Sequence, residues 1–450
     1  MTLKFGTDGV RGVANTELTP ELVLALGRAA ARVLGGERYL IGRDTRLSGP
    51  LIQAALTAGL TSEGAEVTDL GVVPTPAVAA LSAERDVPAA MISASHNPFP
   101  DNGVKFFTAG GRKLSDAVEE RLERELAAIL RSEPEPPGAA AGPDGDAVGR
   151  VTTEPDAVVR YTQRLLTVLE GESLDGMRLV LDCANGAASE IAPDVFTAAG
   201  AAVEVLHASP DGVNINAACG STHPHDVQRA VVESGADAGL AFDGDADRVL
   251  AVDGEGDLVD GDHLIALCAV DLRTRGRLRD DTVVVTVMTN LGFRLAMAEH
   301  GINVVETQVG DRYVLEALDE GGWSLGGEQS GHVIFRDLAT TGDGLLTGLM
   351  SLAAVRRTGR PLAQVAGDVM TRLPQVLRNV RVRSRDGLAA AEELWAEVAR
   401  VEAELGEHGR VVLRPSGTEP LVRVMVEAPT QAEADAASLR LAKVVETTLA

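Results

Sequence analysis

The sequence is short of basic residues. Its 41 lysine and arginine residues stand against 66 aspartate and glutamate residues, which gives a formal net charge of −25. This imbalance argues against a protein that binds the phosphate backbone of DNA or RNA, or an anionic membrane surface. A small anionic ligand remains possible, because a few basic residues in a cleft can dominate the local potential.

Cysteine and long apolar runs are also scarce. The three cysteines, Cys183, Cys219 and Cys268, are an odd number at wide spacing, which favours buried thiols in a reducing compartment over a disulfide framework or a zinc site. No secretory signal pattern is present at the start, and apolar runs such as 264–270 are far shorter than the roughly 18 residues of a membrane span. The sequence therefore predicts a cytoplasmic protein with neither a nucleic-acid nor a membrane partner.

Two common phosphate-binding loops are missing as well. The chain has no G-x-x-x-x-G-K-[ST] loop and no G-x-G-x-x-G fingerprint. These absences exclude a P-loop kinase and a dinucleotide enzyme of the usual kind, because each needs its glycine-rich loop to hold phosphate groups. A phosphoryl donor, if there is one, must come from another part of the chain.

The chain divides into several domains. Its 450 residues predict about three domains at about 150 residues each, and 45% hydrophobic with 24% charged residues is an ordinary globular composition. Three stretches, starting at 39–42, 178–181 and 283–287, each run from an apolar strand through a polar turn into a helix and a second strand. This pattern predicts three similar α/β units with mostly parallel sheets.

The last part of the chain has a different order of elements. From Val376 a strand and a helix are followed by two adjacent strands and a final helix, which predicts an antiparallel sheet with helices on one face. A connector rich in proline and glycine lies at 131–150. The predicted fold is thus three α/β domains and a C-terminal α+β domain around a central cleft, with domains at 1–150, 151–254, 255–370 and 371–450.

An acidic turn is a candidate metal site. Asp243, Asp245 and Asp247 lie in AFDGDADRVLAV between two apolar runs, so three carboxylates can converge on Mg²⁺ or Ca²⁺. An EF-hand is excluded, because Arg248 and Gly254 occupy the positions of its conserved glycine and glutamate. A solvated acidic turn is the alternative, but burying three like charges between strands would be costly without a cation.

A second candidate is the serine in MISASHNPFPDNGVKFF. Ser95 follows an apolar strand, stands next to His96, and precedes an Asn-Pro turn that leads toward Lys105. Lys105 is flanked by apolar residues and is a candidate for a partly buried ammonium. The segment could also be a structural turn or part of a Ser-His-Asp hydrolase, although no G-x-S-x-G motif surrounds this serine.

Two more loops could bind a ligand. In GGEQSGH, the residues Glu328, Ser330 and His332 can offer an acceptor, a hydroxyl and an imidazole to a sugar, although the segment could be only a turn. RPSGTEP, at 414–420, joins the two adjacent strands of the last domain and is followed by Arg423. Guanidinium groups, hydroxyls and a glycine amide together suit a phosphate. One motif in each predicted domain implies a shared cleft.

The four motifs, in this order, resemble those of the α-D-phosphohexomutases, and ISASHNP with DGDADR is the most specific part of the match. The resemblance covers essentially the whole chain. It implies a phosphoserine donor in the first domain, one Mg²⁺ in the second, sugar recognition in the third and phosphate binding in the fourth. The residues carried over are Ser95, Asp243, Asp245 and Asp247 at the metal; His96, Lys105, Arg11 and Arg248 around the transferring phosphate; Glu328, Ser330 and His332 at the sugar; and Arg414, Ser416, Gly417, Thr418 and Arg423 at the other phosphate.

Within the family, FGTDGVRG at the start, GDRYV at 310–314 and Gln329 resemble the enzymes that act on glucosamine phosphates. This implies interconversion of glucosamine 6-phosphate and glucosamine 1-phosphate through the 1,6-bisphosphate, for UDP-N-acetylglucosamine and cell-wall precursors. It also implies glucose or glucosamine 1,6-bisphosphate as activator and a first phosphorylation of Ser95 by a kinase or by autophosphorylation; a homodimer is left open. The alternatives are a phosphomannomutase or phosphoglucomutase, a sugar phosphatase that uses the same phosphoserine, and a non-catalytic sensor.

Overall fold

The computed structural model describes residues 9–131, 142–383, 387–415 and 421–449. The chain forms two compact units. The larger unit comprises the chain up to Val287 together with Val305–Ala366, and the smaller unit comprises Met288–Val304 and the chain from Gly367 onward. Each unit is described by itself below.

The first sheet of the larger unit has the strand order β1-β5-β4-β2-β3-β7, with β6 paired to β5. Strands β4, β2, β3 and β7 are parallel, whereas β1, β5 and β6 add antiparallel pairs at one edge. Its elements are β1 (Val10–Val13), α1 (Pro20–Leu34), β2 (Arg38–Arg43), α2 (Gly49–Ser62), β3 (Glu66–Val72), α3 (Thr75–Arg85), β4 (Ala89–Ile92), β5 (Asp101–Thr108), β6 (Arg112–Lys113), α4 (Asp116–Arg131) and β7 (Val151–Thr153).

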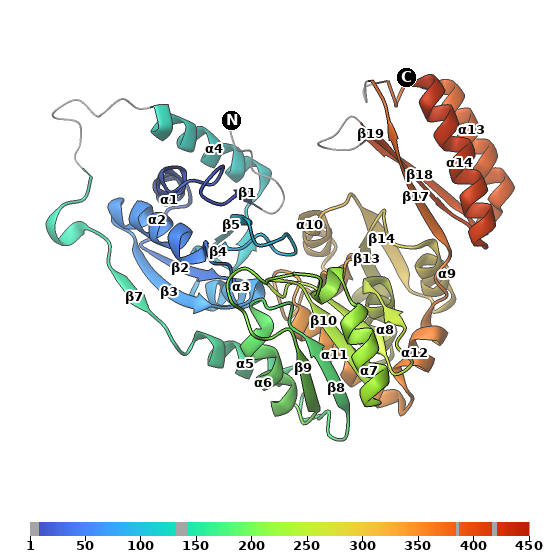
Figure 1. Cartoon of the computed structure of the whole chain (residues 1–450), viewed down its shortest axis with the longest axis horizontal. Helices are drawn as coiled ribbons and strands as arrows, with labels where there is room; N and C mark the ends of the chain where they lie inside the picture. The colour runs from blue at the N-terminus through green and yellow to red at the C-terminus, as the bar shows by residue number, and fades with distance from the viewer. Residues whose placement is uncertain (1–8, 132–141, 384–386, 416–420, 450) are drawn as a thin grey trace. The chain divides into compact units, whose positions relative to one another are not determined.

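Helices cover both faces of this sheet (Figure 1). Tyr39 and Ile41 lie two residues apart in β2, so their side chains point to the same face of the sheet. Both belong to the core that α1, α2 and α4 close. On the opposite face Gly42 approaches α3 so closely that a Cβ atom there would lie 2.5 Å from Val78. Strand β2 is therefore apolar along its whole centre, as expected for a strand that is buried on two sides.

The second sheet has the order β12-β11-β10-β8-β9, in which β10, β8 and β9 are parallel and β11 and β12 are antiparallel. The third has the order β14-β13-β15-β16, with β13 and β15 parallel and β16 antiparallel. Their elements are α5 (Ala157–Thr167), β8 (Arg178–Asp182), α6 (Ala188–Ala198), β9 (Ala202–Leu206), α7 (His225–Ser234), β10 (Ala238–Phe242), β11 (Val249–Asp253), β12 (Leu258–Val259), α8 (Gly261–Thr274), β13 (Thr282–Thr286), α9 (Leu291–Glu299), β14 (Asn303–Thr307), α10 (Asp311–Gly321), β15 (Leu325–Gly327), β16 (Val333–Phe335), α11 (Gly344–Thr358) and α12 (Leu362–Val369).

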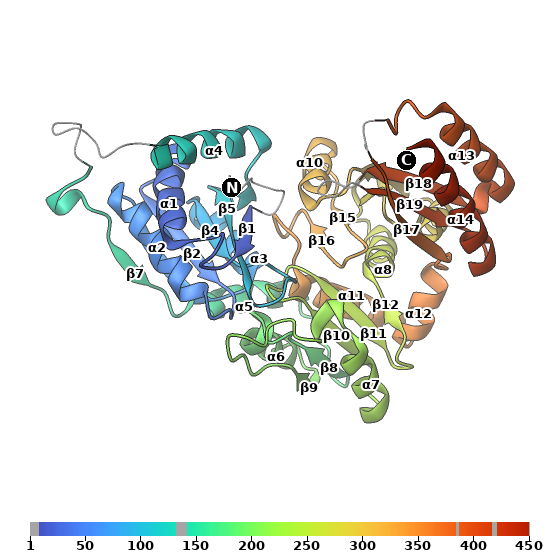
Figure 2. The same ribbon diagram turned by 45° about the horizontal axis from the view of Figure 1, so that its top comes forward.

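The C-terminal part of the smaller unit is an antiparallel sheet with the order β17-β19-β18. Both of its helices lie on the same face of the sheet, as Figure 2 shows. The elements are β17 (Gln375–Arg381), α13 (Glu392–Leu405), β18 (Arg410–Pro415), β19 (Leu421–Glu427) and α14 (Gln431–Thr448). The predicted α+β arrangement is confirmed, and so are the three α/β sheets with parallel strands at their centres.

The predicted domain boundaries are not tested by the sheet topology alone. The four domain ranges stay predictions, and the structure adds that β7 and β12, just beyond residues 150 and 254, still pair with the sheets that precede them.

Among the described residues, none of the helices combines the length and the apolar character that a membrane span requires. Cys183, Cys219 and Cys268 are buried, unpaired thiols, as the sequence predicts.

A single buried arginine holds the loop that connects β4 to β5. The side chain of Arg46 is fully enclosed and donates to Asp44 Oδ2 over 2.8 Å. Its two terminal nitrogens donate to four backbone carbonyls of the loop over 2.6–3.0 Å, namely those of Ser95, Asn97, Pro98 and Asp101. The five N–H donors of the guanidinium are thus all used, and the loop is fixed although it forms no regular structure.

Arg46→Ala should destabilise the larger unit by about 3–5 kcal/mol, because the change leaves the buried carboxylate of Asp44 without its cation and removes one donor from each of four carbonyls. Urea unfolding followed by circular dichroism measures the effect. Arg38→Ala is the matched control, since the ion pair between Arg38 and Glu66 is 71% and 50% exposed and should contribute less than about 1 kcal/mol. Equal effects of the two changes would show that other contacts hold the loop.

Candidate active site

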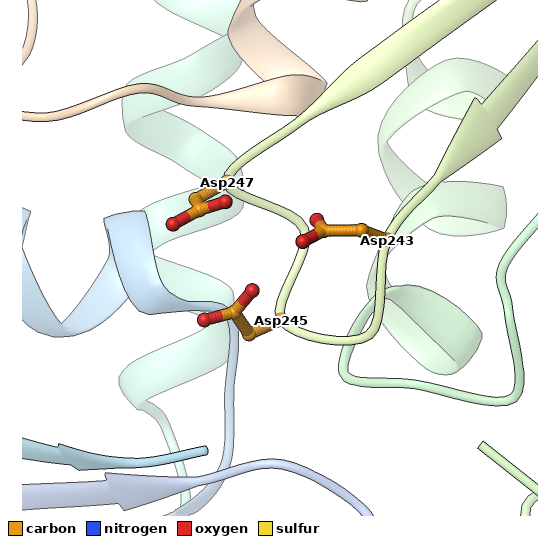
Figure 3. A group of neighbouring side chains, drawn as sticks. All are labelled: Asp243, Asp245 and Asp247. Carbon is orange, nitrogen blue, oxygen red and sulfur yellow. The ribbon is translucent and has the colours of Figure 1, made fainter. Parts of the chain in front are cut away.

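The acidic turn predicted from the sequence is a buried carboxylate cluster. Asp243, Asp245 and Asp247 lie in the connection between the antiparallel strands β10 and β11, and their side chains face a common space (Figure 3). One oxygen from each carboxylate lies within 4.8 Å of the others, and the three residues are at most 2% exposed. The solvated-turn alternative is therefore wrong, because solvent does not reach these carboxylates.

Lys105 contacts two of the three carboxylates. Lys105 Nζ lies 2.7 Å from Asp245 Oδ2 and 3.4 Å from Asp247 Oδ2. Burial, together with Asp245 and Asp247, raises the pKa of Asp243 well above its ordinary value. Burial also acts to raise the pKa of Asp247, but Lys105 and His332 outweigh it and hold that pKa well below its ordinary value. The three carboxylates therefore differ in how readily they ionise.

The cluster fits a hard divalent cation. Asp245 Oδ1 and Asp247 Oδ1 are buried and accept no hydrogen bond from the described residues. Buried carboxylate oxygens without donors are costly, and a cation with oxygen ligands would satisfy them. The donor set therefore suits Mg²⁺ or Ca²⁺, as the sequence predicts.

Ser95 lies directly against this cluster. Its Oγ donates to Asp243 Oδ2 over 2.6 Å, although Ser95 itself is only 1% exposed. The residue has a left-handed backbone with φ of 53°, which turns its side chain toward the carboxylates. Ser93 is different, because its Oγ donates to Asp44 and accepts the N–H of Ser95. Of these two serines, Ser95 is the one at the acidic cluster.

Basic groups surround the serine hydroxyl. His96 Nδ1 lies 3.3 Å from Ser95 Oγ and 3.1 Å from Arg248 Nη1. Burial, with Arg248 and Arg11 nearby, lowers the pKa of His96 to about 4, so its imidazole is neutral at pH 7. Arg11 Nη1 donates to the carbonyl of Ala94, just before the serine. The structure thus places His96, Arg11 and Arg248 near Ser95 and Lys105 against the neighbouring aspartates, and their roles at a transferring phosphate stay predictions.

The loop GGEQSGH contributes side chains that point in different directions. Glu328 Oε1 accepts the backbone N–H of Gly310, and Ser330 is exposed, with its Oγ 3.5 Å from Glu328 Oε2. His332 is buried, with Nδ1 3.6 Å from Asp247 Oδ1 and Nε2 3.1 Å from Asp311 Oδ2. The contact between His332 and a sugar stays a prediction, because in this arrangement its imidazole faces two carboxylates.

The smaller unit carries an arginine pair of its own. Arg414 of β18 and Arg423 of β19 are direct cross-strand partners. Burial, and then the positive charge of Arg423, lowers the pKa of Arg414. Like charges opposite each other destabilise a sheet, so an anion between these guanidinium groups would stabilise it. The other predicted members of this loop, Ser416, Gly417 and Thr418, lie outside the described residues.

Sequence reasoning missed two residues that complete the site. Thr75, at the start of α3, donates its hydroxyl to Asp245 Oδ2 over 2.6 Å and its N–H to the carbonyl of Asp245. Asn216 donates to the carbonyls of Ser95 and Asn97 over 2.9 and 3.1 Å. Neither residue stands in a recognisable motif, and only the folded chain brings them within reach of the serine loop and the aspartates.

Comparison with known proteins agrees with this geometry. Four family models match in succession, each described as a phosphoglucomutase/phosphomannomutase domain: alpha/beta/alpha domain I at residues 2–133, domain II at 159–256, domain III at 260–373 and the C-terminal domain at 377–444. A protein named phosphoglucosamine mutase from Saccharopolyspora erythraea is 56% identical over 453 residues, which cover 99% of each chain.

Two solved structures share the fold. A phosphoglucomutase/phosphomannomutase family protein from Burkholderia thailandensis is 25% identical, with a TM-score of 0.80 over 99% of this chain and 97% of that one. Aspergillus fumigatus N-acetylphosphoglucosamine mutase, solved with GlcNAc-6P and magnesium, is 21% identical, with a TM-score of 0.68 over 100% and 96%. The resemblance of the four motifs is confirmed, and the chain belongs to the α-D-phosphohexomutase family, the family of the phosphoglucomutases and phosphomannomutases.

Proposed function

We propose that the protein interconverts glucosamine 6-phosphate and glucosamine 1-phosphate by passing a phosphoryl group through Ser95. The observation that carries this proposal is the 2.6 Å hydrogen bond from Ser95 Oγ to Asp243 inside the buried carboxylate cluster. A serine that carries the phosphoryl group must stand where a cation and basic side chains can balance the added charge. The relative named phosphoglucosamine mutase, 56% identical, supports the choice of an amino sugar over mannose or glucose.

Asp243, Asp245 and Asp247 would hold one Mg²⁺ together with an oxygen of the Ser95 phosphate, and magnesium in the fungal structure supports this choice. When bound, the cation stabilises negative charge on the transferring group and on the serine oxygen. In the dephosphorylated chain, Asp243 Oδ2 holds the hydroxyl proton of Ser95.

The basic residues around the serine balance and orient the phosphate groups. A phosphoserine carries a charge of about −1.5 to −2 at neutral pH, and the substrate brings a second phosphate toward it. Arg11, Lys105 and Arg248 supply positive charge there, and neutral His96 adds a ring nitrogen beside Ser95 Oγ. Ser95 is only 1% exposed. This burial limits the access of water, which would otherwise hydrolyse the phosphoserine.

The remaining motifs supply sugar and phosphate recognition in this proposal. Glu328, Ser330 and His332 would read the sugar, while Arg414 and Arg423, with Ser416, Gly417 and Thr418, would bind the phosphate that is not reacting. The two binding modes exchange the phosphates of the bisphosphate, so the arginine loop must accept either one. The corresponding domains are 1–150 for the phosphoserine, 151–254 for the metal, 255–370 for the sugar and 371–450 for the phosphate, arranged around the predicted cleft.

Further parts of the proposal rest on the family resemblance. They are activation by glucose or glucosamine 1,6-bisphosphate, a first phosphorylation of Ser95 by a kinase or by autophosphorylation, and a role in making UDP-N-acetylglucosamine and cell-wall precursors. The cytoplasmic location and a homodimer also stay predictions from the sequence.

Ser95→Ala should abolish both mutase activity and incorporation of labelled phosphate without changing the circular dichroism spectrum, because it removes the acceptor hydroxyl. Ser93→Ala is the matched control and should still accept phosphate, since Ser93 is hydrogen-bonded to Asp44 and not to the carboxylate cluster. Mass spectrometry of the labelled peptide locates the phosphate. A label on Ser93 would contradict the assignment, and release of inorganic phosphate as fast as substrate is lost would favour the phosphatase.

Asp245→Asn should slow phosphoryl transfer by about 10²-fold or more, because one preorganised charge at the transferring group is lost. It should also weaken binding of Mg²⁺ in a direct titration. Glu255→Gln makes the same change of charge at an exposed position in the turn after β11 and should have no effect on either measurement. Normal metal binding by Asp245→Asn would remove the acidic turn from the active site.

Arg414→Ala should weaken substrate binding by about 10- to 150-fold, which corresponds to the loss of a charge-assisted contact of about 1.5–3 kcal/mol. Because the intermediate must be held while it reorients, free glucosamine 1,6-bisphosphate should also appear in solution during turnover. Arg381→Ala removes an exposed arginine from β17 of the same sheet and is the control. An unchanged KM without release of bisphosphate would leave Arg414 with only a structural role.

A further inference from the structure

The two oxygens of the Asp245 carboxylate have different surroundings. Oδ2 accepts the hydroxyl of Thr75 over 2.6 Å and the ammonium of Lys105 over 2.7 Å. Oδ1 is buried and accepts no hydrogen bond from the described residues. Thr75 itself is 0% exposed, so water does not compete for its hydroxyl. Two donors therefore occupy one oxygen of this carboxylate, and the other oxygen is left for a cation.

The backbone of the acidic turn is held by contacts that do not involve this hydroxyl. The carbonyl of Gly244 accepts the N–H of Ala187 over 2.8 Å. The carbonyl of Asp245 accepts the backbone N–H of Thr75 over 3.0 Å. A Cβ atom at Gly244 would lie 2.7 Å from the carbonyl oxygen of Ser95, so the turn also packs directly against the serine loop. The Thr75 hydroxyl thus acts on the carboxylate of Asp245 and not on the path of the turn.

Thr75 contacts Asp245 twice because of its place at the start of α3. The preceding residue, Pro74, makes no capping hydrogen bond with its side chain. The N–H of Thr75 is bonded to the carbonyl of Asp245 instead, which fixes the backbone from which the hydroxyl projects. The side chain of threonine is also restricted at χ1 by its β-branch. The hydroxyl is therefore held toward Oδ2 by both the backbone and the side chain.

The other two carboxylates of the cluster have different hydrogen bonds. Asp247 resembles Asp245, because its Oδ2 lies 3.4 Å from Lys105 Nζ while its buried Oδ1 accepts no hydrogen bond from the described residues. Asp243 accepts hydrogen bonds at both oxygens, from Ser95 Oγ at Oδ2 and from the backbone N–H of Arg248 at Oδ1. The cluster therefore offers single free oxygens and no carboxylate with two free oxygens.

The number of free oxygens bears on which cation fits. Ca²⁺ takes about six to eight oxygen ligands and readily uses both oxygens of one carboxylate. Mg²⁺ is smaller and octahedral, and it is bound through few carboxylates together with water or phosphate oxygens. A carboxylate whose second oxygen is already occupied can supply only one ligand. This arrangement suits Mg²⁺ better than Ca²⁺, a choice that the residue types alone leave open.

We propose that Thr75 is a positioning residue that makes Asp245 a one-oxygen ligand and thereby favours Mg²⁺ over Ca²⁺. The proposal rests on the proposed function in one respect, namely that the acidic cluster binds a divalent cation. Without the hydroxyl, Lys105 is the remaining donor of the pair at Oδ2, and its ammonium also lies near Asp247. The carboxylate of Asp245 can then rotate and offer both oxygens, which weakens the site for Mg²⁺ and improves it for Ca²⁺.

The test is titration of the full-length protein with Mn²⁺, which accepts the same oxygen ligands. Electron paramagnetic resonance measures the unbound ion, and Mg²⁺ and Ca²⁺ are added as competitors. Thr75→Val removes the hydroxyl but keeps the shape of the side chain and the N–H. It should raise the Kd for Mn²⁺ by about tenfold or more and lower the preference for Mg²⁺ over Ca²⁺. Thr75→Ser keeps a hydroxyl and should bind all three cations as the wild type does.

Thr347→Val is the matched control. Thr347 is also 0% exposed, and its hydroxyl donates to the carbonyl of Asp343 over 2.7 Å and not to the acidic cluster. Its replacement should lower thermal stability through the loss of a buried hydrogen bond, but should leave Mn²⁺ binding and the competition by Mg²⁺ and Ca²⁺ unchanged. A general loss of structure would affect both valine variants alike.

Several results would overturn the proposal. Wild-type binding of Mn²⁺ by Thr75→Val would show that Asp245 needs no support from the hydroxyl, and weaker binding with an unchanged preference for Mg²⁺ would remove the role in selectivity. Equal weakening by Thr75→Val and Thr75→Ser would assign the effect to packing at the start of α3. Thr75→Ala removes the same hydroxyl and decides the matter if Thr75→Val does not fold. Mn²⁺ binding that Asp245→Asn leaves unchanged would instead show that the proposed metal site itself is wrong.

Discussion

The serine loop depends on the buried guanidinium of Arg46. A loop without regular structure has backbone carbonyls that no neighbouring strand can satisfy, and leaving them unpaired in the interior is costly. Arg46 satisfies four of them at once while Asp44 neutralises its charge. An apolar side chain of the same size could fill the space but could not fix the path of the loop. The left-handed conformation of Ser95 is held by this arrangement, and with it the direction of the hydroxyl.

Around that loop, the larger unit buries three carboxylates close together. Three carboxylates meet where Lys105 is the nearest ammonium, and two of their buried oxygens accept no hydrogen bond from the described residues. The smaller unit brings together two like charges of the opposite sign, because Arg414 and Arg423 lie directly across from each other. Each arrangement is unfavourable alone and becomes favourable with a ligand of opposite charge, so stability and ligand binding are linked at both places.

The sequence predicts the parts of the site that follow from local pattern. Turns after apolar runs place Ser95 and the three aspartates at strand ends, and the order of strands and helices predicts the antiparallel C-terminal sheet. Long-range partners could not be predicted, because Arg46 reads as an ordinary residue of RDTRLSG and Thr75 as a helix start. The antiparallel edge strands β1 and β16 were also not predicted, since strand direction depends on pairings that local periodicity does not contain.

Burial of the acidic cluster has a consequence for the order of events at Ser95. Phosphorylation would replace the hydroxyl that donates to Asp243 with a group of charge about −1.5 to −2. Asp243 already has a raised pKa because burial and two neighbouring carboxylates oppose its ionisation. A phosphate beside it would oppose that ionisation further, and a divalent cation held by the three aspartates would offset the charge of both groups. Phosphoserine and divalent cation are therefore expected to stabilise each other, so that the state ready for phosphoryl transfer is the one in which both are present.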